Sequence, residues 1–202
     1  DEVGAPVGRL KIALCTKDFT GAPLSKACAD AAIAAARLCE SLGHQVEEAR
    51  PPLDDLPLSR AWRVVPAANL WNAVSARARA LGREPQPGDV EPVTWEWTQQ
   101  GRTLSAADYM DSITTMHMIG RRVGTFLNDY DFILSPTLGR PPVKLGEIDM
   151  SMTDVASYVT HVFEQISPMT PLFNQTGGAA MSVPLAMSDD GLPIGIQFGG
   201  GI

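Results

Sequence analysis

Residues 10–48, LKIALCTKDFTGAPLSKACADAAIAAARLCESLGHQVEE, decide the fold class of this chain. The first residues, LKIALC, form an apolar run of strand length, and HQVEE at 44–48 alternates weakly like a second strand. Residues 25–42 between them predict an amphipathic helix that ends at Gly43. Its apolar stripe is expected to consist of Leu24, Cys28, Ala31, Ala35, Leu38, Cys39 and Leu42. A strand, a helix and a strand in this order are typical of a βαβ crossover on a parallel sheet.

The rest of the chain extends this unit into an α/β protein. Its 202 residues suffice for one large domain or two small ones. We expect residues 1–50 to form the βαβ unit, residues 51–130 a helical insert, and residues 131–202 a strand, a helix and a buried hairpin. Helices are expected at residues 56–82, 95–101, 105–130 and 153–165, and a further strand at 132–135. The sequence therefore predicts a mixed central sheet flanked by helices.

The end of the chain is nearly free of charge. From residue 165 onward the only charged residues are Asp189 and Asp190, which lie in the turn sequence SDDG. Apolar runs at 180–187 and 192–199 flank this turn and predict a hairpin. A hairpin with so little charge is expected to be buried on both faces. The rest of the chain could cover it, but a partner segment missing from this chain fits that role better.

Composition limits the classes of partner and location. The net charge of −7 and the isoelectric point of about 4.9 argue against nucleic acid and anionic membranes, since both need a basic face. The longest uncharged stretch, 165–188, carries three prolines and does not predict a membrane span. The start lacks the basic region of a signal peptide, and an odd number of cysteines fits a reducing compartment. We therefore expect a cytoplasmic protein.

The cysteines allow a catalytic and a structural interpretation. Cys15 follows the first strand, where active sites of α/β proteins often lie, and a thiolate there with His44 as its base would be a cysteine hydrolase pair. However, Cys28 and Cys39 lie on the apolar stripe of the predicted helix. This placement favours buried, unreactive cysteines.

Other chemistry-bearing residues give weaker signals. Lys17 is interpreted as a solvated loop lysine next to its counter-ion Asp18 rather than as a general base. The sequence contains no Cys-x-x-Cys, His-x-x-x-His, GxGxxG or Walker motif, so we expect neither a metal nor a cofactor. Tryptophans cluster in the insert, where they either line a substrate pocket or pack the insert onto the sheet; they are Trp62, Trp71, Trp95 and Trp97.

A resemblance to a known family adds to these observations. PLFNQTGGAAMSVP (171–184) and SDDGLPIGIQFG (188–199) resemble the C-terminal part of the amidase signature family, whose pattern there is close to F-N-x-T-G-x-P-A-x-S-V-P and S-x-D-G-L-P-x-G-x-Q. YDFILSPT (130–137), LKIAL (10–14) and LGHQVE (42–47) resemble further segments of the family in the same order. One departure is Gly178-Ala179, where the family usually has Gln-Pro. The middle, VTWEW (93–97), looks most like the branch of 6-aminohexanoate cyclic-dimer hydrolases and related bacterial amidases.

The resemblance implies an amide hydrolase of the Ser-cisSer-Lys type, and this chain would be the C-terminal portion of its fold. In the family a serine attacks the amide carbonyl, a cis-serine and a lysine relay protons, and backbone N–H groups hold the oxyanion. The Gly/Ser-rich loop that carries these groups is not in this sequence, so no catalytic residue is assigned. The catalytic segment is expected before Asp1. The chain would complete the sheet and line the substrate pocket, and it is predicted to be inactive alone. A chain that begins without Met and ends directly after a strand is expected to be a fragment.

Two sets of residues are assigned to substrate binding. Those that match the family's loop near the active site are Phe173, Asn174 and Thr176. Those taken from the aromatic insert rather than from a motif are Asn69, Trp71 and Trp95. The expected partners are a small-molecule amide and the missing N-terminal catalytic segment, and a homodimer stays open.

Two alternatives also stay open. A glutaminase subunit of a tRNA-linked amidotransferase belongs to the same family, so the C-terminal motif alone does not separate it from a hydrolase. A standalone, non-catalytic α/β binding domain is the other alternative. The uncharged hairpin argues against that alternative, because a standalone domain should not leave a large apolar area uncovered.

Overall fold

The computed structural model describes residues 4–201, which divide into two compact units. Unit 1 comprises the described parts of Asp1–Asp54, Gly120–Pro142 and Ser167–Ile202. Unit 2 comprises Asp55–Ile119 and Val143–Ile166. Helix α4 (Ala106–Phe126) belongs to unit 2 up to Ile119 and to unit 1 from Gly120 onward.

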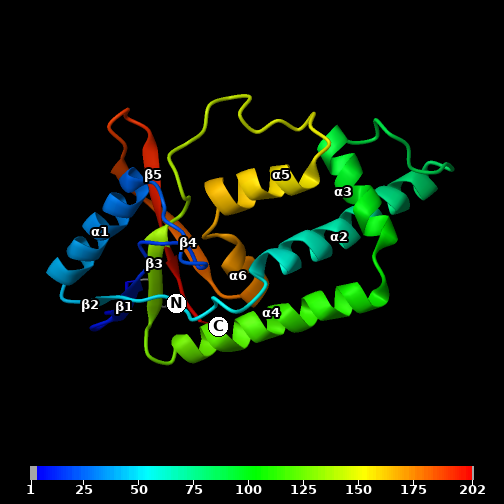
Figure 1. Ribbon diagram of the computed structural model, residues 1–202. Coiled ribbons are helices and arrows are strands. Elements are labelled where there is room, and N and C mark those ends of the chain that lie inside the picture. Colours follow the sequence, from blue (N-terminus) through cyan, green and yellow to red (C-terminus); the bar gives the residue numbers. More distant parts are fainter. Residues whose placement is uncertain (1–3, 202) are drawn as a thin grey trace. The chain divides into compact units, whose positions relative to one another are not determined.

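Unit 1 is built on a mixed five-stranded sheet (Figure 1). Its elements are β1 (Lys11–Leu14), α1 (Lys26–Ser41), β2 (Gln45–Glu48), β3 (Phe132–Pro136), α6 (Pro171–Thr176), β4 (Ala180–Met187) and β5 (Pro193–Gly199). The strand order is β2-β1-β3-β5-β4. β1 pairs in parallel with β2 and β3, whereas β5 runs antiparallel to β3 and β4. The predicted fold class, an α/β protein with a mixed sheet flanked by helices, is confirmed.

Helix α1 covers one face of this sheet with small side chains. Ser25 caps its start by accepting a hydrogen bond from the backbone N–H of Cys28 at 3.3 Å. The residues buried against the sheet are Cys28, Ala31, Ala32, Ala35, Ala36 and Cys39. The predicted stripe is wrong at Leu38 and Leu42, which are 48% and 67% exposed. Alanine and cysteine let the helix approach the sheet closely, and the longer leucines then fall outside the contact.

The two strands of the C-terminal hairpin differ in burial. β5 lies between β3 and β4, and its Ile194 and Ile196 join the core of unit 1. β4 is the outer strand, and its residues Met181, Leu185 and Met187 are 60%, 43% and 64% exposed. Within residues 4–201 nothing covers these β4 side chains. Their expected burial by a further segment stays a prediction.

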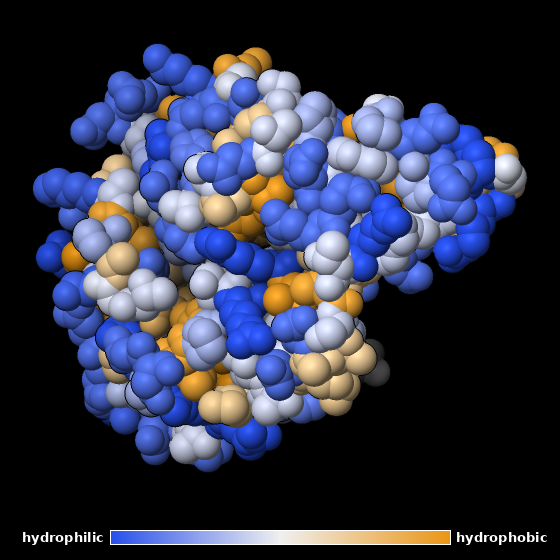
Figure 2. All heavy atoms as spheres, turned by 45° about the vertical axis from the view of Figure 1, so that its right-hand side comes forward, coloured by the Kyte–Doolittle hydropathy of each residue, from blue (hydrophilic) through white to orange (hydrophobic). Residues whose placement is uncertain are grey.

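Unit 2 is helical. Its elements are the N-terminal part of α4, α2 (Leu58–Ala80), α3 (Pro92–Thr103), α5 (Val155–Val159) and a π-helical segment, η1 (Thr160–Ile166). The helix expected at 153–165 is thus formed by α5 and η1 together. The core of unit 2 consists of Ala67, Val93, Trp97, Val155 and Val159. Among the described residues, no helix is both long and apolar enough to cross a membrane. Hydrophilic side chains cover most of the face seen in Figure 2, with smaller hydrophobic areas between them.

Candidate functional site

The two most distinctive sequence motifs pack against each other in unit 1. The aromatic ring of Phe173, on α6, lies directly over Gly199 of β5, where a Cβ atom would come within 1.9 Å of the ring. Gly178 has the same role nearby, since a Cβ there would lie 2.8 Å from the carbonyl oxygen of Gly200. Gly177 ends α6 in the left-handed conformation, with φ of 73°. The glycines of both motifs therefore let α6 lie directly on the end of β5.

The remaining side chains of α6 provide polar groups. Asn174 is exposed, and the hydroxyl of Thr176 accepts a hydrogen bond from the backbone N–H of Gly178 at 3.3 Å. Gln175 is different, because both polar atoms of its side-chain amide are buried without a hydrogen-bond partner in the part of the chain that the structure describes. A buried amide without partners is costly, so each such group calls for an explanation. Sequence analysis missed Gln175, because it occupies the variable position of the motif.

The three predicted site residues of unit 2 lie on two helices, Asn69 and Trp71 on α2 and Trp95 on α3. Asn69 is exposed on α2, and Trp71 lies two positions further along, so the two side chains leave the helix in different directions. Trp71 is half-buried, with the guanidinium of Arg102 5.6 Å from its ring centroid. Trp95 is half-buried on α3. Phe173, Asn174 and Thr176 belong to unit 1, so three of the six predicted site residues lie in each unit.

Trp97 packs in the core of unit 2. Its Nε1 donates a hydrogen bond to the backbone carbonyl of Arg63 at 3.1 Å. Its ring meets that of Phe163 edge-on, with centroids 6.1 Å apart. These contacts lie within unit 2, so Trp97 packs inside the insert, and packing of the insert onto the sheet stays a prediction. Trp62 instead has a buried Nε1 without a partner among residues 4–201.

The cysteine hydrolase interpretation is wrong. The thiol of Cys15 donates a hydrogen bond to the carbonyl oxygen of Ala49 at 3.2 Å, and burial raises its pKa to about 12. His44 accepts a hydrogen bond from the backbone N–H of Leu10, at the opposite end of β1. The two side chains are therefore apart, and the thiol stays protonated. Cys28 and Cys39 are also buried and free, as the helical stripe predicts.

The loop after β1 differs from expectation in one respect. Lys17 is exposed, as predicted, but Asp18 is buried and is not its counter-ion. The carboxylate of Asp18 accepts hydrogen bonds from the backbone N–H groups of Thr20 and Ala22, each at 2.8 Å. Asp18 therefore stabilises the turn of its own loop. Within residues 4–201 no three histidine, cysteine, aspartate or glutamate side chains gather as a metal site would require.

Known proteins match this chain along almost its whole length. The family model for amidases matches residues 2–201. The 6-aminohexanoate-cyclic-dimer hydrolase of Paenarthrobacter ureafaciens is 25% identical over 199 residues, which cover 95% of this chain and 40% of that protein. A solved structure of a 6-aminohexanoate cyclic dimer hydrolase superposes on 100% of this chain and 43% of its own, with a TM-score of 0.90 and 24% identity. A glutamyl-tRNA(Gln) amidotransferase subunit from Thermotoga maritima gives a TM-score of 0.65 at 25% identity, over 99% of this chain and 40% of its own.

Two facts follow from these matches. The chain spans less than half the length of the relatives it resembles. The match nevertheless includes both motifs that pack together at Phe173 and Gly199. The chain belongs to the amidase signature family.

Proposed function

We propose that this chain is one portion of an amide hydrolase whose serine, cis-serine and lysine lie on polypeptide outside residues 1–202. One observation carries the proposal: the family model matches residues 2–201, yet these residues correspond to only 40% of a related hydrolase. The residues of this chain then serve to complete the sheet and to bind the substrate.

The open edge of the sheet supports this role. β4 is the outer strand of the sheet and carries no charged side chain; its only edge-protecting features are Pro184 and the register shift between Pro184 and Ala186. Native proteins usually protect such edges more fully, with charges or a covering segment as well, because unpaired strands associate with other chains. We propose that the catalytic portion adds to β4 and covers its exposed methionines and leucine.

The polar surface of α6 supports a binding role. Asn174 carries an exposed primary amide, which donates and accepts hydrogen bonds as an amide substrate does. Phe173 packs α6 onto β5 and so positions the backbone that carries this amide. We propose that Asn174 and Thr176 contact the substrate, with Phe173 as their support. Asn69, Trp71 and Trp95 of unit 2 stay proposed walls of the same pocket.

The structural matches favour a hydrolase of small amides over an amidotransferase component, because the TM-score of the cyclic-dimer hydrolase is 0.90 against 0.65 for the amidotransferase protein. The proposed substrate is therefore a small amide. Three free cysteines support a cytoplasmic location. No metal or cofactor enters the proposed mechanism.

The test compares the complete polypeptide with residues 1–202 alone. Intact mass first establishes whether a catalytic portion is present in the sample. Both proteins are then given 6-aminohexanoate cyclic dimer, an aryl acylamide and glutamine. We expect the complete polypeptide to release amine from one of the first two, and residues 1–202 to release none. If the complete polypeptide releases ammonia from glutamine but hydrolyses neither of the other two amides, the amidotransferase alternative is favoured. Hydrolysis of any of the three by the isolated residues 1–202 would contradict the proposal.

A variant tests the assignment of the site. In the complete polypeptide, Asn174→Ala should raise KM or lower kcat by about tenfold or more, because it removes a hydrogen-bonding amide from the proposed pocket. Asn128→Ala is the matched control, since Asn128 is also exposed and lies just beyond α4. Equal activity of the two variants would show that Asn174 does not contact the substrate.

A further inference from the structure

A small pocket in unit 1 lies beyond the carboxyl ends of β1 and β2. Its volume is about 210 Å³, and its lining residues are Leu14, Cys15, Thr16, Lys17, Glu48, Ala49 and Arg50. The strand order reverses between β1 and β3, whereas this pocket lies on the β2 side of β1. It shares with the ligand sites of open α/β sheets its place beyond the carboxyl ends of the strands. β3 and β1 separate this pocket from the contact of Phe173 with β5.

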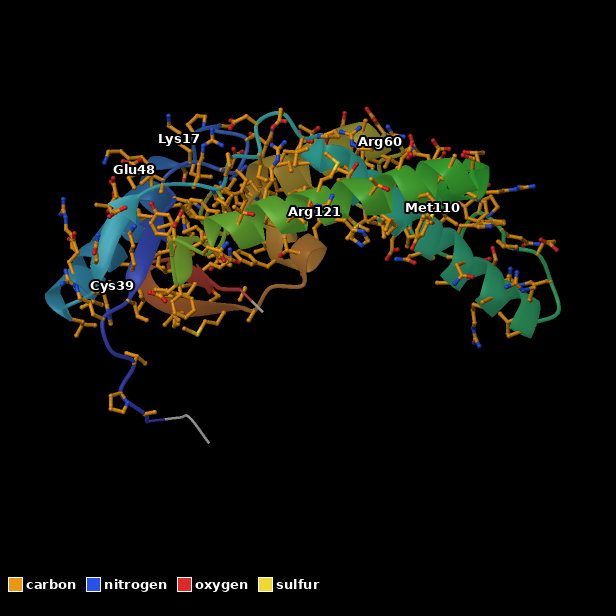
Figure 3. All side chains as sticks on the ribbon, turned by 90° about the horizontal axis from the view of Figure 1, so that it is seen from below. Lys17, Cys39, Glu48, Arg60, Met110 and Arg121 are labelled. Carbon is orange, nitrogen blue, oxygen red and sulfur yellow. The ribbon has the colours of Figure 1, made fainter. Side chains whose placement is uncertain are left out.

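The pocket carries two opposite charges that do not neutralise each other. Lys17 and Glu48 both line it and lie at the same end of the unit (Figure 3). Within residues 4–201 no ion pair or hydrogen bond engages the ammonium of Lys17. Glu48 uses one carboxylate oxygen to accept a hydrogen bond from the hydroxyl of Thr16 at 2.6 Å. Its other oxygen is left for a cationic group.

The walls of the pocket are held in place by contacts of their own. Arg50 donates to the carbonyl oxygen of Phe19 at 3.3 Å and pairs with Asp54. The turn that follows Lys17 is fixed by the carboxylate of Asp18. At the floor, the thiol of Cys15 is protonated and bonded to the carbonyl of Ala49. A ligand would therefore meet the exposed ammonium of Lys17 and the exposed carboxylate of Glu48 beside a neutral, buried thiol.

We propose that this pocket binds a small zwitterion, an amino acid whose carboxylate pairs with Lys17 and whose ammonium pairs with Glu48. The volume has room for roughly seven water-sized groups, which suits a short amino acid rather than a peptide. Arg50 adds positive potential on the side of Lys17, although Asp54 already uses part of its hydrogen-bonding capacity. Pairing both ends of the ligand distinguishes it from a simple anion or a simple amine.

The test is calorimetric titration of the complete polypeptide with β-alanine, propionate and ethylamine. Propionate lacks the ammonium of β-alanine, and ethylamine lacks its carboxylate. We expect millimolar binding of β-alanine and at least tenfold weaker binding of the other two. Equal binding of propionate, or no binding of β-alanine at high millimolar concentration, would overturn the proposal.

Variants locate the binding to this pocket. Lys17→Met and Glu48→Gln should each weaken β-alanine binding about tenfold or more, since each removes one charge-assisted pair. Lys144→Met is the matched control, because Lys144 is an exposed lysine of unit 2. A circular dichroism spectrum of each variant shows that the fold is kept. Undiminished binding by a folded Lys17→Met variant would place the ligand elsewhere and refute the assignment. Amide hydrolysis in the same preparations is an independent readout, so failure of this site is distinguishable from failure of the proposed activity.

Discussion

At the residue scale, the contact of Phe173 with Gly199 fixes how α6 meets the sheet. The Cβ atom of Gly199→Ala would lie 1.9 Å from the ring, so the ring or the strand must move. We expect a loss of about 1–3 kcal/mol in the free energy of unfolding, as for other overpacked cores. Urea denaturation measures it. Gly124→Ala is the control, because nothing lies near a Cβ there, and it should raise stability by about 0.5–1 kcal/mol.

A double-mutant cycle shows whether the ring is the cause. Phe173→Leu shortens the side chain that occupies the space above Gly199. The loss caused by Gly199→Ala should be smaller in this background, which gives a coupling of at least about 0.5 kcal/mol. If the losses of stability caused by Gly199→Ala and Phe173→Leu are additive, the ring of Phe173 is not the reason why this position needs a glycine.

The thiol of Cys15 gives a prediction about pH. Burial raises its pKa to about 12, so the folded state holds this proton more tightly than the unfolded state. The resulting contribution to stability is complete below about pH 8.5 and is lost as the pH rises toward 12. At pH 10.5 the wild type should lose roughly 2 to 3 kcal/mol that Cys15→Ala does not lose. Urea denaturation of both proteins at pH 7.5 and 10.5 measures the difference, and equal losses would contradict a buried thiol.

Some of these residue roles could be predicted from sequence and others could not. Cys28 and Cys39 share a helical stripe with alanines, so their burial follows from periodicity alone. The role of Asp18 is not predictable, because a counter-ion and a turn-forming aspartate look alike next to Lys17. Gln175 gives no signal, since its unusual state depends on what surrounds its amide, and sequence spacing does not report that.

At the element scale, the contact of α2 with α3 depends on Gly101. A Cβ atom at this position would lie 1.9 Å from the carbonyl oxygen of Ala67, and a backbone atom cannot rotate away. Gly101→Ala should therefore destabilise the protein by about 3 kcal/mol or more, at the upper end for overpacking. Thermal unfolding of Gly101→Ala, compared with wild type and with Gly124→Ala, measures this loss of stability. A shift as small as that of Gly124→Ala would mean that the two helices separate at little cost.

The exposed edge of β4 predicts association of residues 1–202 when they are produced alone. Leu185 is 43% exposed on this uncharged strand. Leu185→Lys should reduce the associated fraction several-fold, because edge lysines oppose strand pairing. Leu145→Lys makes the same charge change at a leucine that is 104% exposed in unit 2. Light scattering compares them, and an equal effect of both variants would mean that the edge has no special role.

The positions of helices and strands are predicted best from the sequence, and the burial of their side chains is predicted worst. Periodicity locates α1 and the hairpin to within a few residues. It fails at Leu38 and Leu42 because small residues, not large ones, set the distance between α1 and the sheet. For β4 the strand pattern predicts burial, and the structure shows that residues 4–201 do not provide it. In both cases the pattern of an element does not report what lies beside it.

At the scale of the whole molecule, charge and the β4 edge act in opposite directions. The net charge of −7 at pH 7 makes copies of the chain repel each other, whereas the exposed side chains of β4 draw them together. Near the isoelectric point of about 4.9 the repulsion disappears, so association of residues 1–202 should rise steeply between pH 7.5 and 5. Adding about 0.5 M salt at pH 7.5 should also increase association, because the shorter screening length weakens the repulsion between copies of the chain.

The complete polypeptide provides the contrast that makes this prediction decisive. If another portion of the same protein covers β4, lowering the pH to 5 should increase its scattering much less than that of residues 1–202. The Leu185→Lys variant should likewise lose its advantage in the complete polypeptide, because the edge is then no longer exposed. Equal association of the complete and shorter proteins would mean that β4 stays open in both, and the catalytic portion would then have to join this chain at another surface.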